Sequence, residues 1–294
     1  MNTRDIGEMA LLGSMWGGSF IFMRVAAPEF GPLPLMATRV LLASLFLIPV
    51  FLHAGNGKVL WQYRADLALM GLLNSALPFV LFAWATLSLT AGYTAVINAC
   101  APLFTAVVAF LWVGERLSGS ANVGLLVGLG GVTALVWDEL SLASAADSLP
   151  MVAALLAALS YGVAANHARV RLQGVGSLEI TTGSQLASTL LLVPVSLFYL
   201  PSTLPSANAW LAALILGVPC TGIAYILFFR LLARLGPARA MTVTYIVPLA
   251  AMVCGAVFLR EPVTIAMLVG CSLILLGTAL ATGLLTVNSL LRRF

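Results

Sequence analysis

The feature of the sequence that most constrains its fold is a succession of apolar runs of about twenty residues, separated by short polar breaks. A helix needs about 20 apolar residues to cross the hydrocarbon of a bilayer. Backbone groups in that hydrocarbon must be hydrogen-bonded internally, so only helices and closed barrels span it. A barrel strand would alternate apolar and polar residues over about ten positions, whereas these runs are continuously apolar. The sequence therefore predicts an all-α integral membrane protein.

Ten such runs follow one another, and the breaks between them carry the Gly, Pro and charged residues that end helices. We expect ten transmembrane helices, over residues 6–26, 33–53, 66–88, 92–113, 119–137, 149–167, 178–199, 208–230, 237–259 and 263–285. Composition agrees, because only 8% of the residues are charged and the mean hydropathy is +1.07, whereas a soluble domain carries about 25% charged residues. Every break is short, so the sequence predicts one membrane domain.

The positive charges are distributed unevenly over the two sides of this predicted domain. If the N-terminus lies in the cytoplasm, ten spans return the C-terminus there, and all but three of the fourteen Lys and Arg residues fall on that side. Positively charged loops remain in the cytoplasm, so we expect both termini there, in a bacterial inner membrane. The net charge of +4 is explained by this bias, and no basic patch with exposed aromatic residues indicates nucleic-acid binding.

The second half of the sequence repeats features of the first. Offsets of 145 or 146 residues align scarce residue types, namely Trp16 with Tyr161, Gly17 with Gly162, Arg24 with Arg169, Pro49 with Pro194, Pro102 with Pro248, Glu115 with Glu261, Gly124 with Gly270, and Gly131 with Gly277. We call two residues equivalent when one of these offsets aligns them. Because each copy holds five spans, the second must enter the membrane from the opposite side. We therefore predict two five-helix inverted repeats, residues 1–145 and 146–294.

Prolines interrupt four of the predicted spans, at Pro78, Pro102, Pro219 and Pro248. Each proline frees a backbone carbonyl and permits a bend. Such interruptions are tolerated at membrane depth only against protein or a wet cavity. Because Pro102 and Pro248 are equivalent, we expect them to act as paired hinges that close one end of a central cavity while the other end opens.

Few polar side chains fall inside the spans, and no Asp or Glu lies at the centre of one. Asn74 and Asn98 are costly to bury and could line a path through the protein. Glu8 and His167 lie near span ends, so we expect little or no dependence on a buried carboxylate, and facilitated diffusion or exchange fits as well as proton antiport. For Arg39, extension to the membrane interface or a bond to another helix is favoured over holding a substrate carboxylate.

The sequence gives no sign of a metal, a cofactor or a catalytic centre. The four cysteines lie within apolar runs without metal-ligand spacing, and we interpret them as packing residues. The chain also lacks H-E-x-x-H, an Asp-rich pyrophosphate motif and G-x-S-x-G, so an intramembrane enzyme is disfavoured. A sensor or assembly factor remains open as a further class.

Several segments carry a family resemblance: Trp16-Gly17-Gly18-Ser19-Phe20, the stretch from Pro34 to Arg39, Asn98 to Pro102, Gly114-Glu115-Arg116-Leu117, and Arg260-Glu261-Pro262. With them, essentially the whole chain resembles the EamA-type ten-helix members of the drug/metabolite transporter superfamily, and most of all the YddG-type exporters of aromatic amino acids. The resemblance implies an inverted repeat, alternating access, and a central cavity lined by the first, third, fourth, sixth, eighth and ninth spans. Carried onto this chain, it places in or near the cavity Trp16, Asn74, Phe79, Asn98, Tyr161, Tyr225 and Tyr245.

We therefore expect a secondary transmembrane transporter, a monomer or homodimer, that exports amino acids or related small metabolites. The alternative is an exporter of drugs, cationic compounds or other metabolites from the same superfamily. The four-helix small multidrug relatives use a glutamate in the middle of their first helix, where this chain has Met15 and Trp16. That departure disfavours a cationic substrate. A nucleotide sugar would need several cations in the cavity, and Arg39 alone is too few.

Overall fold

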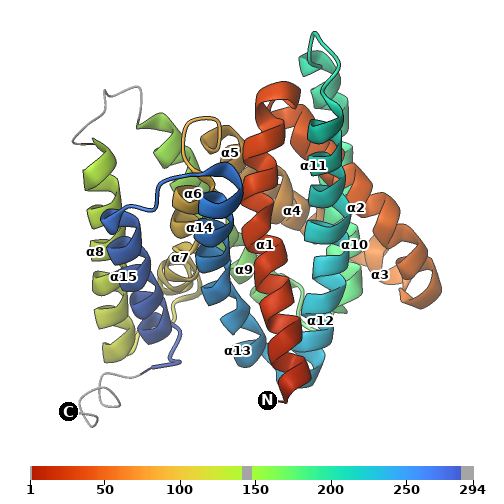
Figure 1. The fold of residues 1–294 in the computed structure, drawn as a ribbon. Coiled ribbons are helices and arrows are strands. Elements are labelled where there is room, and N and C mark those ends of the chain that lie inside the picture. Colours follow the sequence, from red (N-terminus) through yellow and green to blue (C-terminus); the bar gives the residue numbers. More distant parts are fainter. Residues whose placement is uncertain (1, 141–147, 286–294) are drawn as a thin grey trace.

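Every secondary-structure element is helical in the described part of this computed structural model, residues 2–140 and 148–285 (Figure 1). Eight helical segments there are long and apolar enough to cross a membrane, and two shorter apolar helices complete the ten expected. The predicted all-α membrane fold is confirmed. The boundary expected between the two halves, at residues 145 and 146, lies outside the described residues.

The first half contains α1 (Thr3–Phe30), α2 (Pro32–Ala54), α3 (Gly57–Gln62), α4 (Arg64–Gly71), the π-helical turn η1 (Leu72–Ala76), α5 (Leu77–Ala85), α6 (Ala91–Asn98), α7 (Ala101–Val108), the π-helical turn η2 (Ala109–Val113) and α8 (Gly119–Leu140). The second half contains α9 (Leu149–Arg171), α10 (Ser177–Ser196), the 3₁₀ turn η3 (Leu197–Tyr199), α11 (Ala207–Gly217), the π-helical turn η4 (Val218–Ile223), α12 (Ala224–Leu235), α13 (Pro237–Ala240), the 3₁₀ turn η5 (Met241–Tyr245), α14 (Ile246–Leu259) and α15 (Ile265–Ala281). Consecutive elements join into single spans, as α4, η1 and α5 do in one half and α11, η4 and α12 in the other.

Four prolines inside the spans coincide with changes of helix type or with helix breaks, whereas Pro28, Pro49 and Pro194 lie within α-helices. The π-helical turn η1 ends shortly before Pro78, and its counterpart η4 contains Pro219. Pro102 lies in the first turn of α7, after the break that ends α6, and Pro248 lies in the first turn of α14, after η5. A proline cannot donate the hydrogen bond of a regular helix, so each site departs locally from α geometry. The predicted interruptions are present, while hinge motion at Pro102 and Pro248 stays a prediction.

Equivalent residues make equivalent helix contacts. At Gly17, where α1 crosses α14, an added Cβ would lie 2.6 Å from the carbonyl oxygen of Val247. At the equivalent Gly162, where α9 crosses α7, it would lie 2.9 Å from the backbone nitrogen of Thr105. Only glycine permits both close approaches. The shorter helices α8 and α15 are equivalent as well, and they pack side by side at one edge of the molecule (Figure 1).

The equivalent helices α1 and α9 run in opposite directions. The start of α6 is hydrogen-bonded to the loop after α14, so the fourth and ninth spans are antiparallel. The start of α1 meets the residues before the ninth span through Glu8 and Arg234, and the end of α9 meets the residue after the fourth span through Arg169 and Glu115. Both meetings therefore occur at one end of the molecule, which we call the Glu115 end. The opposite end, where α1 reaches Arg24, we call the Arg24 end.

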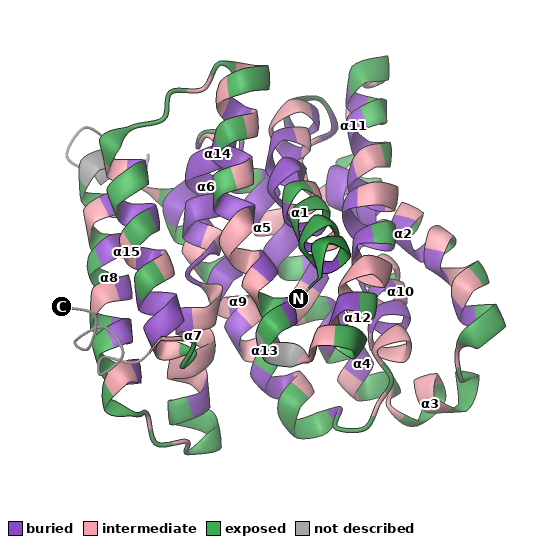
Figure 2. Cartoon of the chain, turned by 60° about the horizontal axis from the view of Figure 1, so that its bottom comes forward, coloured by how far each residue is buried: buried purple, intermediate pink, exposed green. Residues whose placement is uncertain are grey.

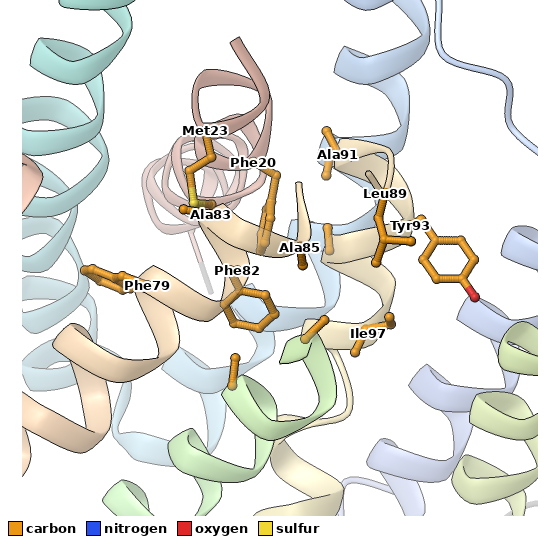
Figure 3. Packing of buried hydrophobic residues seen from close by; sticks show 14 of the residues in the cluster. Phe20, Met23, Phe79, Phe82, Ala83, Ala85, Leu89, Ala91, Tyr93 and Ile97 are labelled. Carbon is orange, nitrogen blue, oxygen red and sulfur yellow. The ribbon is translucent and has the colours of Figure 1, made fainter. Parts of the chain in front are cut away.

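The core lies between the spans, and apolar side chains also cover the outside. Phe20 of α1 meets Phe82 of α5 edge to face, with ring centroids 5.6 Å apart (Figure 3). Figure 2 shows buried residues along the inner helix faces and exposed residues around the periphery. Leu52, Leu126 and Leu190 are each more than 70% exposed, as befits side chains in contact with lipid rather than water.

Candidate functional site

A cavity of about 610 Å³ lies where the two halves meet. The halves contribute its walls jointly, because the lining residues come from α1, α2, α4, η1, α5, α6 and α7 on one side and from α9, α10, η4, α12, η5, α14 and α15 on the other. All seven residues expected in or near a cavity line it, namely Trp16, Asn74, Phe79, Asn98, Tyr161, Tyr225 and Tyr245. Pro102 lines it as well, whereas Pro248 is not among the described lining residues. That these side chains contact a solute stays a prediction.

Aromatic rings form much of the cavity wall. Trp16 contacts Tyr225 edge to face with ring centroids 6.4 Å apart, and it contacts Phe228 at 5.5 Å. Tyr225 in turn stacks on Phe229, with centroids 6.1 Å apart and planes 14° from parallel. These rings come from α1 and α12, which face each other across the repeat interface. Such a wall offers flat apolar faces to a bound molecule.

The polar groups of the cavity differ in how completely the protein satisfies them. Asn74, in the π-helical turn η1, donates from Nδ2 to the Tyr225 hydroxyl at 3.3 Å. Asn98, the last residue of α6, has a buried Oδ1 without a hydrogen-bond partner among the described residues. A buried acceptor without a partner costs free energy that a bound donor can recover. Ser160 and Asn166, which are not among the described lining residues, donate to the backbone carbonyls of Leu73 and Thr105, so they join helices.

Arg39 lies in the cavity wall and is only 4% exposed. Its Nε donates to the Thr221 hydroxyl at 2.9 Å, and its guanidinium carbon lies 3.8 Å from the centre of the Phe79 ring. The expected bond to another helix is therefore present, but the alternative extension to the membrane interface is wrong, because the guanidinium points inward. Sequence reasoning underrated Arg39 as a cavity residue, although a charge inside a span was the signal that could have found it.

The acidic residues lie outside the cavity wall, as none of the described lining residues is Asp or Glu. Glu8 accepts from Arg4 at 2.9 Å and pairs with Arg234. His167 is buried, with Nε2 3.4 Å from a carboxylate oxygen of Asp66. Both side chains are thus held in contacts at the Glu115 end. Among the described residues, no group of three or more His, Cys, Asp and Glu could hold a metal ion.

The two ends of the cavity are bounded by equivalent charge pairs. At the Arg24 end, Nε of Arg24 lies 3.6 Å from Glu261, whose other carboxylate oxygen accepts the Ala91 N–H at 2.9 Å. This carboxylate thereby ties the start of α6 to the loop after α14. At the other end, Arg169 donates two hydrogen bonds to Glu115, and these hydrogen bonds hold the pKa of the Glu115 carboxyl below its usual range.

The ends also differ in how tightly their helices pack. At the Arg24 end, α6 packs closely against α14 and α1. The equivalent elements at the Glu115 end are α13 and η5 on one side and α7 and α9 on the other. Among the described residues these make at most marginal contact. The cavity is therefore closed at the Arg24 end, while its walls stand apart at the Glu115 end.

Comparison with known proteins agrees with this architecture. The protein YvbV of Bacillus subtilis, named as an uncharacterized transporter, is 27% identical over 95% of this chain and 91% of its own length. A protein of Streptantibioticus cattleyicolor, named as a probable terminal-alkyne amino-acid exporter, is 27% identical over 95% of this chain and 93% of its own. A solved crystal structure shares the fold, with a TM-score of 0.66 and 22% identity over 97% of this chain and 99% of that one.

The match to a known family covers both halves of the chain separately. The EamA-like transporter family matches residues 7–137 and again residues 148–283. The two matched segments correspond to the two sets of five spans that contribute walls to the cavity. The chain is thus a multi-pass membrane protein, and it belongs to the EamA-like transporter family.

Proposed function

We propose that this protein is a secondary transporter that exports amino acids or related small metabolites by alternating access. The observation that carries the proposal is the cavity between the two halves, which combines aromatic faces with buried polar groups that have no partner in the described part of the chain. Its volume of about 610 Å³ lies in the range of small-molecule sites. A zwitterion or similar metabolite would find hydrogen-bonding groups for its polar end and rings for its side chain.

The unequal ends of the cavity support alternating access. In this conformation α6 and α14 close the Arg24 end, and their equivalents at the Glu115 end are apart. Exchanging the two arrangements would close the Glu115 end and open the Arg24 end, as the inverted repeat permits. Pro102 and Pro248 would be the hinges of that exchange, because each lies in the first turn of a helix next to a break.

An amino-acid substrate is supported from two directions. The Streptantibioticus relative bears the name of an amino-acid exporter, and the cavity wall offers aromatic contacts together with Asn98 and Arg39. An exporter of cationic drugs is the alternative, and it is less well supported, because the described wall holds a buried arginine and no acidic residue. We further propose a bacterial inner-membrane location with both termini in the cytoplasm, a monomeric or homodimeric state, and transport that needs no buried carboxylate.

Transport in proteoliposomes would test the function. Purified protein is reconstituted into liposomes, and uptake of a panel of labelled amino acids is measured in exchange mode and under an imposed pH gradient. We expect saturable uptake of at least one member. Substituting Trp16→Ala should reduce it roughly tenfold, since a packed aromatic contact is lost. The matched control Trp137→Ala, on a side chain that is 72% exposed, should leave uptake unchanged. Folded protein that transports no member would contradict the proposal.

A further inference from the structure

Arg39 carries a buried charge that the described protein does not neutralise. The ion pairs among the described residues involve Arg4, Arg24, His167, Arg169, Arg171 and Arg234, and none involves Arg39. Its side chain is nonetheless only 4% exposed and borders the cavity. A buried charge without a partner is unfavourable, and in membrane spans such residues pair or mark a substrate path. The cavity is the place from which a counter-charge can come.

The surroundings of Arg39 hold the guanidinium in one orientation. Thr221, in the π-helical turn η4, accepts from its Nε, and the same hydroxyl donates to the carbonyl of Leu216 in α11 at 2.8 Å. The Phe79 ring lies against the guanidinium plane, and one terminal nitrogen is 3.9 Å from the sulfur of Met23. A guanidinium has five N–H groups. One terminal N–H thus contacts the Met23 sulfur. No hydrogen bond among the described residues occupies the other terminal N–H groups, so these remain available to an acceptor in the cavity.

The equivalent place in the second half shows that the fold does not require this charge. Ser184 is equivalent to Arg39, and the next residue, Gln185, donates to the hydroxyl of Ser75 at 2.9 Å. Ser75 is itself equivalent to Thr221. Both halves thus link a span to a π-helical turn of the other half through one hydrogen bond. Only the first half uses an arginine to do so, and a neutral side chain serves in the second.

We propose that Arg39 is the subsite for the carboxylate of the transported molecule. Paired N–H groups of a guanidinium match the two oxygens of a carboxylate, and the rings of Trp16 and Tyr225 line the same cavity. The substrate class is therefore carboxylates with an apolar or aromatic body, for which the carboxylate is obligatory and the amino group is not. This inference rests on the proposed function and specifies which part of the substrate the protein recognises.

Four related ligands separate the contributions of carboxylate and amine. The probes are L-phenylalanine, 3-phenylpropanoate, L-phenylalaninamide and 2-phenylethylamine, each titrated into the purified full-length protein while thermal unfolding is followed. We expect the first two, which carry a carboxylate, to stabilise the protein. The last two keep the ring and the amine but lack the carboxylate, so they should not stabilise the protein. Stabilisation by the amide or the amine equal to that by the carboxylates, or no stabilisation by either carboxylate, would overturn the assignment.

Substitution of Arg39 provides the second arm. Arg39→Gln keeps a donor for Thr221 but removes the charge, and it should weaken carboxylate binding roughly 10- to 100-fold, the effect of losing a charge-assisted hydrogen bond. Arg39→Lys should retain part of the affinity. The matched control Gln185→Met removes the equivalent hydrogen bond away from the cavity and should leave the affinity within about twofold. Unchanged affinity in Arg39→Gln would overturn the proposal.

The unfolding temperature without ligand distinguishes a substrate-binding Arg39 from a purely structural one. Because Arg39→Gln removes an uncompensated buried charge, the variant without ligand should unfold at a temperature no lower than the parent. If the variant is instead destabilised as much as Gln185→Met and still responds to 3-phenylpropanoate, Arg39 is a structural link. A different result would show that the proposed function fails while the Arg39 assignment holds. In that case 3-phenylpropanoate would bind through Arg39, but no amino acid would cross the membrane.

Discussion

The two ends of the cavity are built from equivalent residues, yet only one of them is closed. At the Arg24 end, Glu261 forms an ion pair with Arg24 and accepts a hydrogen bond from the Ala91 amide, and its side chain is 11% exposed. At the Glu115 end, Glu115 and Arg169 pair with each other, and their side chains are 43% and 54% exposed. The repeat thus places the same residue types at both ends. How firmly each end is held depends on what the second carboxylate oxygen contacts, which is the Ala91 amide for Glu261 and Arg169 for Glu115.

The sequence contains a chemical reason for the inequality. The residue equivalent to Ala91, which donates to Glu261, is Pro237 at the start of α13. Proline has no N–H, so Glu115 could not accept the corresponding bond even if the Glu115 end closed. Closure at that end lacks one charge-assisted hydrogen bond that closure at the Arg24 end possesses. We therefore expect the resting protein to favour the conformation with a closed Arg24 end.

The largest expected effect follows from removing Glu261. Glu261→Ala should lower the free energy of unfolding by about 2 kcal/mol, because a largely buried carboxylate and two of its partners lose their contacts. The measurement is a denaturant titration of the purified protein in mild detergent. The equivalent substitution Glu115→Ala affects an exposed pair and should change little. Equal losses of unfolding free energy in Glu261→Ala and Glu115→Ala would contradict the difference between the two ends.

A smaller effect is expected from restoring the missing amide. Pro237→Ala should stabilise closure of the Glu115 end roughly 2- to 10-fold, the shift that one net hydrogen bond gives. Cys220 borders the cavity, so the rate at which a small maleimide alkylates it, in a chain without the other three cysteines, reports on access. We expect slower alkylation in Pro237→Ala. Combining Pro237→Ala with Glu115→Gln should give a smaller decrease in the alkylation rate, since the hydrogen-bond acceptor loses its charge. An equally large decrease in the double variant would show that Pro237→Ala does not act through Glu115.

The smallest effect is a pH dependence at the Glu115 end. The hydrogen bonds from Arg169 lower the pKa of Glu115 in the folded protein, so this pair stabilises the fold above the unfolded-state pKa, and the contribution disappears as the pH falls through the folded-state pKa. Thermal unfolding of the parent and of Glu115→Gln should therefore differ slightly at pH 7 and converge toward pH 3. Because the pair is exposed, the difference should shrink with added salt. Divergence at low pH would contradict the assignment.

Sequence reasoning reached the architecture and the cavity residues for different reasons. Hydropathy is a property of short stretches, so the ten spans could be read directly, and the equivalence of Trp16 with Tyr161 indicated a repeat. The seven cavity residues came from the family resemblance, and the structure places all of them around one cavity. The burial of Arg39 could not be assigned, because the direction of its side chain depends on which helices surround α2.

The apolar runs, the aligned prolines and the aligned charges of the two halves were determined by the sequence alone, since each depends on residue type and spacing along the chain. The tertiary structure decided which helix faces meet the cavity and which end is closed. The π-helical turns η1 and η4 change the register of the residues after them, and the Glu261 bond joins Ala91 to a residue 170 positions away. Contacts of that range arise from packing between spans, which no local pattern encodes.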